Sequence, residues 1–160
     1  MKKELEYIGG NITGVSASVF LCAMGGILVW VNGGSGWYVL STLHGRMLPL
    51  SLIFLSWLFT YALYGFRLAM RVFCKTDRCY LSVQGRVCLA YLLDLVWYAI
   101  FFCTRMSMLA LVVILTSAVL NISVLLKFGK GMIISKSADA AVILCEILYM
   151  IFTVMYGLLK

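Results

Sequence analysis

This chain of 160 residues has little charge, one proline and one histidine. Asp, Glu, Lys and Arg make up 12% of it, where a typical soluble domain has ~25%. Hydrophobic residues account for 64%, and the mean hydropathy is +1.04. Too few polar side chains remain to cover a globule in water. The composition therefore excludes an ordinary soluble domain and predicts an integral membrane protein embedded in a lipid bilayer.

The sequence also lacks the motifs of conventional enzymes and cofactor sites. It contains no G-x-x-x-x-G-K-[ST], G-x-G-x-x-G or H-E-x-x-H pattern. The lone His44 completes neither a Ser-His-Asp triad nor a zinc site, and the six cysteines form no C-x-x-C pair. We therefore assign no catalytic residue and no metal ligand, and we expect that no cofactor is required.

Long apolar runs are what the sequence has in abundance. A helix needs ~20 mostly apolar residues to cross a bilayer, and continuous runs of this kind favour helices over the alternating strands of a barrel. The sequence predicts an all-α fold, a single transmembrane domain of five helices over residues 1–160. The expected spans are residues 11–31, 47–72, 87–103, 106–126 and 138–158.

The net charge of +7 reports membrane topology before it reports a partner. The sequence has no basic run interleaved with aromatic residues, so we expect no nucleic-acid partner. Nine basic residues fall on one side of the predicted spans: Lys2, Lys3, Arg71, Lys75, Arg78, Arg86, Lys127, Lys130 and Lys136. Arg46, Arg105 and Lys160 fall on the other, and Arg67, inside the second span, is expected to snorkel to the headgroups. This distribution predicts a cytoplasmic amino terminus.

Small residues recur at every fourth position of the first span: Gly10, Gly14, Ser18, Cys22 and Gly26. Such a ridge lets another helix approach closely. It could serve packing within one chain or a dimer interface, and we favour packing within the bundle.

Two carboxyl groups lie near the middle of predicted spans, Asp94 in the third and Glu146 in the fifth. A carboxylate at the bilayer centre costs roughly 2.5–3.5 kcal/mol on insertion scales, so such residues face the bundle interior. Helical spacing places Asp94, Trp97 and Phe101 on one face. This face is either a pocket wall with one polar anchor or a contact that ties two helices together. Nothing in the sequence brings the two carboxyls together.

The segment 32–46 turns aromatic and apolar after its glycines, with Trp37 and Tyr38 near its centre. Its rings suit the headgroup level of a membrane. The same rings also suit a lid folded over the mouth of the bundle, and both interpretations stay open.

The order and spacing of several residues resemble the TspO/translocator-protein family of tryptophan-rich sensory proteins. The second span contains W-x-x-x-Y-x-x-x-G, and the third contains D-x-x-W-x-x-x-F-F, where the family has Asn first. The matching residues are Trp37, Tyr38, Pro49, Trp57, Tyr61, Gly65, Asp94, Trp97, Phe101, Phe102, Ala140 and Ala141.

Departures from the family pattern mark a divergent member. The loop motif K-P-x-W-x-P-P is replaced by "TLHGRMLP", and the tryptophan of the fifth helix is missing. The ring that many members carry near Leu109 is also absent.

The resemblance implies a homodimer in a bacterial cytoplasmic membrane, with a pocket inside each bundle. That pocket would take porphyrin, a haem-like tetrapyrrole or a sterol-like molecule, and some members are reported to degrade porphyrin in light. The matching pocket residues are Trp37, Tyr38, Trp57, Tyr61, Asp94, Trp97 and Phe101, to which we add His44, Arg46, Pro49 and Glu146 as candidates. His44 and Arg46 could meet the propionates of a porphyrin.

The resemblance thus implies a membrane sensor or transporter of the TspO type, and two other function classes are weighed against it. The intramembrane carboxyls suggest a small membrane enzyme acting on a porphyrin or a lipid. The ridge of small residues suggests a non-catalytic assembly subunit.

Overall fold

A computed structural model describes residues 2–32, 50–73, 80–127 and 133–159 of the chain, and it confirms the predicted all-α fold. No strand occurs among these residues. The helices follow in the order α1 (Lys2–Gly10), α2 (Ile12–Asn32), α4 (Leu50–Phe73), α5 (Tyr80–Ala99), the π-helix η1 (Ile100–Thr104), α6 (Ser107–Leu126) and α7 (Ile133–Leu159).

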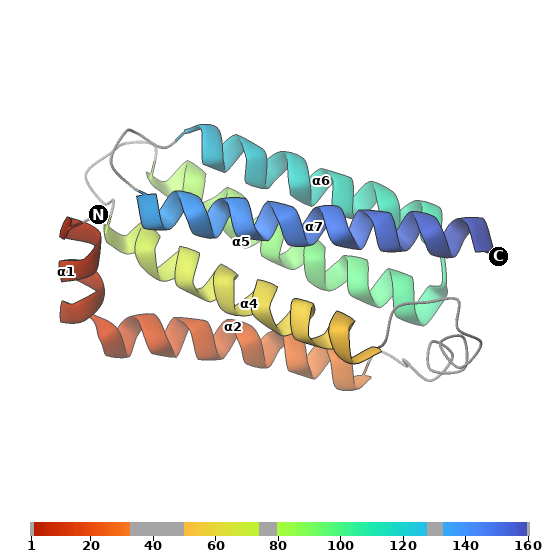
Figure 1. The fold of residues 1–160 in the computed structure, drawn as a ribbon, viewed down its shortest axis with the longest axis horizontal. Coiled ribbons are helices and arrows are strands. Elements are labelled where there is room, and N and C mark those ends of the chain that lie inside the picture. Colours follow the sequence, from red (N-terminus) through yellow and green to blue (C-terminus); the bar gives the residue numbers. More distant parts are fainter. Residues whose placement is uncertain (1, 33–49, 74–79, 128–132, 160) are drawn as a thin grey trace.

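The five long segments α2, α4, α5 with η1, α6 and α7 lie along one common direction as a bundle (Figure 1). Four helices are long and apolar enough to cross a membrane, or up to five if α1 and α2 form one bent span. The third and fifth helices begin at Tyr80 and Ile133, ahead of the predicted starts at 87 and 138. Their first turns are more polar than the runs that follow, so hydropathy alone placed the starts too late.

The short helix α1 crosses one end of the bundle, at 82° to α2 (Figure 1). The buried Glu4 carboxylate accepts hydrogen bonds from the backbone N–H groups of Ile134 (3.4 Å) and Ser135 (3.2 Å). These N–H groups belong to the first turn of α7, where the helix dipole favours a negative charge. Tyr7 donates a hydrogen bond to the Ala69 carbonyl at 3.3 Å. The amino-terminal turn is therefore held to α4 and α7.

Close packing of α2 against α4 uses the ridge of small residues within the chain, as expected. A Cβ added at Gly65 would lie 2.4 Å from the Ser18 carbonyl oxygen and 2.5 Å from Val19 Cα. Ser18 also donates a hydrogen bond to the Gly65 carbonyl at 2.9 Å. Gly26 lies under the rings of Trp57 and Tyr61. A Cβ at Gly14 would meet nothing within 4 Å, so the contact uses only part of the ridge.

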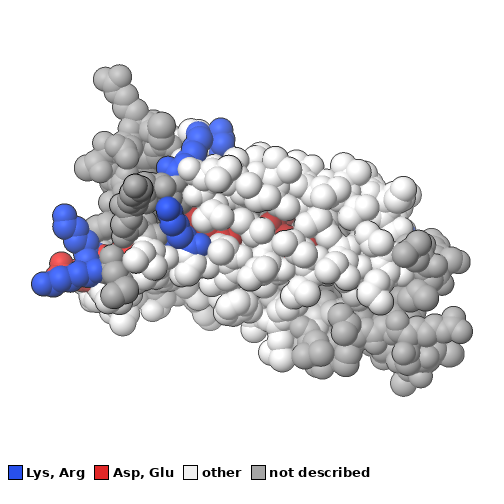
Figure 2. Space-filling model, turned by 45° about the horizontal axis from the view of Figure 1, so that its top comes forward, with Lys and Arg blue, Asp and Glu red and all other residues white. Residues whose placement is uncertain are grey.

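Basic side chains gather at the end of the molecule where α1 lies, as Figure 2 shows. Lys2 and Lys3 of α1 and Lys127, which directly follows α6, are exposed. Arg105 lies at the opposite end, in the two-residue connection between η1 and α6, and has a left-handed backbone (φ 59°). The bundle therefore has one basic end, as the count of basic residues predicted.

Candidate functional site

Six of the eleven candidate ligand-binding residues lie among the described residues, and all six are fully buried. They are Trp57, Tyr61, Asp94, Trp97, Phe101 and Glu146, each with 0% exposure. The other five, Trp37, Tyr38, His44, Arg46 and Pro49, lie outside the described residues. The lid interpretation of segment 32–46 lies outside them too.

Rings from four helical segments meet in the interior and form what we call the aromatic cluster. Its members are Trp57 and Tyr61 of α4, Trp97 and Tyr98 of α5, Phe101 and Phe102 of η1, and Tyr149 of α7. The ring centroids of Trp57 and Trp97 are 6.0 Å apart. Trp97 stacks on Phe101 at 5.6 Å on one side and on Tyr149 at 4.9 Å on the other. Four of the predicted pocket residues, Trp57, Tyr61, Trp97 and Phe101, therefore belong to one buried cluster.

Hydrogen bonds hold these rings in place. The Trp57 indole donates to the Gly26 carbonyl, and the Trp97 indole donates to the Thr153 hydroxyl, each at 3.2 Å. The Tyr149 and Thr60 hydroxyls lie 2.8 Å apart and are hydrogen-bonded. Because buried donors without partners are costly, these bonds keep the rings oriented. A ligand would meet a rigid aromatic surface.

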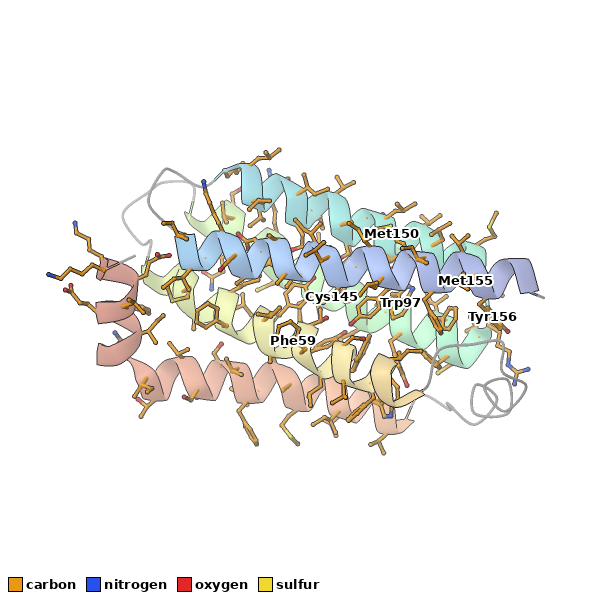
Figure 3. All side chains as sticks on the ribbon, in the orientation of Figure 1. Phe59, Trp97, Cys145, Met150, Met155 and Tyr156 are labelled. Atoms are coloured by element: carbon orange, nitrogen blue, oxygen red, sulfur yellow. The ribbon has the colours of Figure 1, made fainter. Side chains whose placement is uncertain are left out.

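A groove between α4 and α7 adjoins the aromatic cluster. It has a volume of about 330 Å³ and is lined by Ile53, Ser56, Leu148, Tyr149, Ile151, Phe152 and Met155. Figure 3 labels Met155 and Tyr156 on α7, in the half of the bundle that holds the carboxyl terminus, with Trp97 nearby. Ile53, Tyr149 and Phe152 belong both to the groove and to the buried core. The groove therefore leads from the outer surface of the bundle to the aromatic cluster.

Seven polar side chains form a second buried group, the polar cluster, displaced along α7 toward its amino-terminal end. Its members are Tyr64 and Arg67 of α4, Asp94 of α5, Ser117 and Asn121 of α6, and Asp139 and Glu146 of α7, all at 0% exposure. The cluster therefore connects four helices.

Arg67 is the cation of this cluster, and the expectation that it snorkels to the headgroups is wrong. Its Nε donates to Asp139 Oδ1 at 2.6 Å, and its Nη2 donates to Asn121 Oδ1 at 2.7 Å. The guanidinium carbon also lies 5.0 Å from the centre of the Tyr64 ring. Bonds inside the bundle replace the hydration that snorkelling would have preserved.

Glu146 lies at the centre of the hydrogen-bond network. Its Oε1 accepts from the Ser117 hydroxyl (2.5 Å), the Asn121 amide (2.7 Å) and the Tyr64 hydroxyl (3.4 Å). Its Oε2 is buried and has no partner among the described residues. One carboxyl oxygen therefore receives three donors while the other receives none.

Asp94 is buried beside this network, but neither of its carboxyl oxygens has a hydrogen-bond partner among the described residues. It interacts electrostatically with Glu146 and Arg67. The sequence did not indicate that Asp94 and Glu146 are neighbours, whereas the tertiary structure shows that they interact. No group of three or more His, Cys, Asp or Glu side chains suited to a metal ion occurs among the described residues.

Sequence reasoning missed most of the polar cluster. Ser117 and Asn121 are four residues apart, and Asp139 lies seven before Glu146, so each pair shares one helix face. Polar residues that repeat at this spacing inside apolar helices are the signal that indicates such a cluster. The prediction rested instead on Asp94 and Glu146, the two carboxyls nearest the middle of a span. Trp30 and Tyr98, whose rings are 5.2 Å apart, were also missed.

This site is chemically a rigid aromatic surface joined to a buried, carboxyl-rich polar network. Comparison of the chain with protein-family models, with curated proteins and with solved structures finds no match.

Proposed function

We propose that this chain is a membrane sensor or transporter that binds a planar apolar molecule of the porphyrin or tetrapyrrole class. The observation that carries the proposal is the position of the groove, which ends at Tyr149 of the aromatic cluster. Flat conjugated molecules stack favourably on aromatic rings, and a pair of rings gains ~0.5–1.5 kcal/mol beyond area burial. The TspO resemblance implies the same ligand class.

The proposed route of entry is lateral, from the lipid. Leu148, Ile151 and Met155 line the groove. Their side chains are 57%, 52% and 50% exposed at the outer surface of α7. One edge of a macrocycle would lie in the groove, with the remainder against acyl chains. Tyr149 lines the groove, and Trp97 stacks on Tyr149 with 4.9 Å between the ring centroids. Binding is therefore expected to quench tryptophan fluorescence.

The test fills the groove rather than removing the tryptophans. Replacing buried Trp57 or Trp97 with alanine would cost ~3–5 kcal/mol of folding free energy, so lost binding would be ambiguous. Ser56→Phe instead places a ring in the groove, and Leu55→Phe places the same ring at a neighbouring position that is 59% exposed.

Protoporphyrin should quench tryptophan fluorescence of the purified protein in nanodiscs, with saturation. We expect Ser56→Phe to raise the Kd about tenfold or more, equivalent to ~1.4 kcal/mol, and Leu55→Phe to leave it unchanged. Quenching that never saturates, or that both variants weaken equally, would refute the proposal. The roles of His44 and Arg46, and the homodimer, stay predictions.

A further inference from the structure

The polar cluster holds more carboxyl groups than its cation can neutralise. Asp94, Asp139 and Glu146 are three carboxyls with 0% exposure, and Arg67 is the cation bonded among them. The Arg67 guanidinium pairs directly with Asp139 at 2.6 Å. Asp94 and Glu146 therefore have no directly bonded cation among the described residues. An isolated ionised carboxylate in an apolar interior is so costly that the group normally takes up a proton instead.

The surroundings of the two remaining carboxyls differ. Glu146 Oε1 accepts from three groups, as a carboxylate oxygen does. Asp94 has no donor to either oxygen among the described residues, and the hydroxyl of neighbouring Tyr61 has no partner either. Because the two carboxyls also repel each other when ionised, one charge is better placed on Glu146 and a proton on Asp94.

We propose that Asp94 is an exchangeable proton-binding site in the middle of the membrane-spanning bundle, with Glu146 as its charged partner. On release, the O–H bond of the Asp94 carboxyl breaks, its electron pair stays on the carboxylate, and the proton passes to water. Rebinding reverses these changes. This property goes beyond ligand binding and does not depend on the identity of the ligand.

The groups that interact with Asp94 come from three neighbouring helices. From α4 they are Tyr61, Tyr64 and Arg67. From α7 they are Cys145, Glu146 and Tyr149. The α6 helix contributes Ser117, which does not titrate. Of these groups, Glu146 is the other carboxyl, and its negative charge opposes ionisation of Asp94.

A bound proton on a carboxyl has a direct spectroscopic signature, the carbonyl stretch of a protonated acid. Infrared difference spectra of the ligand-free protein in nanodiscs should show this band at neutral pH, and it should shift in D₂O. Asp94→Asn, which keeps the size of the side chain, should remove it. Glu6→Gln, which removes an exposed carboxyl from α1, should leave it in place.

Asp94→Glu serves as a second variant if Asp94→Asn does not fold, and it should keep the band at a changed frequency. Raising the pH should abolish the wild-type band reversibly. No band at neutral pH, or a band that persists in Asp94→Asn and vanishes in Glu146→Gln, would overturn the assignment to Asp94. Because no porphyrin is added, the result is independent of the groove experiment.

Discussion

Arg67 shows at the scale of one residue how a charge is kept inside an apolar bundle. Its side chain is 0% exposed and donates to Asp139 and Asn121. Removing one partner of a buried ion pair leaves the other charge unpaired, which costs ~3–5 kcal/mol. We therefore expect Arg67→Leu to lower the free energy of unfolding by about that much, measured by reversible denaturation in mixed micelles.

Two further variants separate the lost pair from a general effect of removing arginine. Arg86 is half-buried and bonds the Ser123 hydroxyl at 3.0 Å, so Arg86→Leu should cost ~1 kcal/mol or less. The double variant Arg67→Leu/Asp139→Leu should recover part of the loss, because the charge of Asp139 that Arg67→Leu leaves unpaired is removed as well. Equal destabilisation by Arg67→Leu and Arg86→Leu would contradict this interpretation of the ion pair.

Residue type alone could not decide the role of Arg67. Its place near the basic end of an apolar run was compatible with snorkelling, since the stem of an arginine is long enough to reach the headgroups. What decided its orientation was the presence of Asp139 and Asn121 on two other helices. Asp94 is the converse case: the sequence placed it in the interior, but only the fold shows that it lies beside Glu146.

At the scale of helices, the contact between α2 and α4 depends on one glycine. Gly65 faces backbone atoms of α2, and a Cβ there would lie 2.4 Å from the Ser18 carbonyl oxygen. Since a backbone cannot yield as a flexible side chain can, Gly65→Ala should force the two helices apart. Overpacking of this kind costs ~1–3 kcal/mol, and we expect a lower melting temperature in detergent.

Gly14→Ala is the matched control, because it makes the same change on the same contact ridge where nothing lies within 4 Å. Alanine favours a helix over glycine by ~1 kcal/mol, so this variant should be neutral or slightly more stable. A neutral Gly65→Ala would show that α2 and α4 pack less closely than described. The repeat of small residues predicted the contact, but the positions that use it depend on where α4 crosses.

At the scale of the whole molecule, the unequal ends of the bundle predict its orientation in the membrane. Lys2 and Lys3 of α1 and Lys127 after α6 are exposed at one end of the bundle, and Arg105, between η1 and α6, lies at the other (Figure 1). Basic residues are retained on the cytoplasmic side during insertion. We therefore expect the end that carries α1 to face the cytoplasm.

Cysteine labelling tests this orientation in a background whose six native cysteines are replaced. A membrane-impermeant maleimide should label Thr104→Cys in intact cells, since Thr104 is exposed at the end opposite α1. Lys127→Cys should react only after the cells are broken. The reverse pattern would show that the bundle is inserted the other way round.

The sequence by itself determined that the chain is helical and apolar enough for a membrane, because hydropathy and helix length are local properties. It also determined that Asp94 and Glu146 face inward, since the cost of exposing a carboxyl to lipid holds wherever the helix packs. Only the tertiary structure decided that the rings fill one cluster beside a groove and that Asp94 and Glu146 share a polar network with Arg67. Those contacts join residues on different helices, and the rotation and crossing of those helices follow from the packing of all of them together.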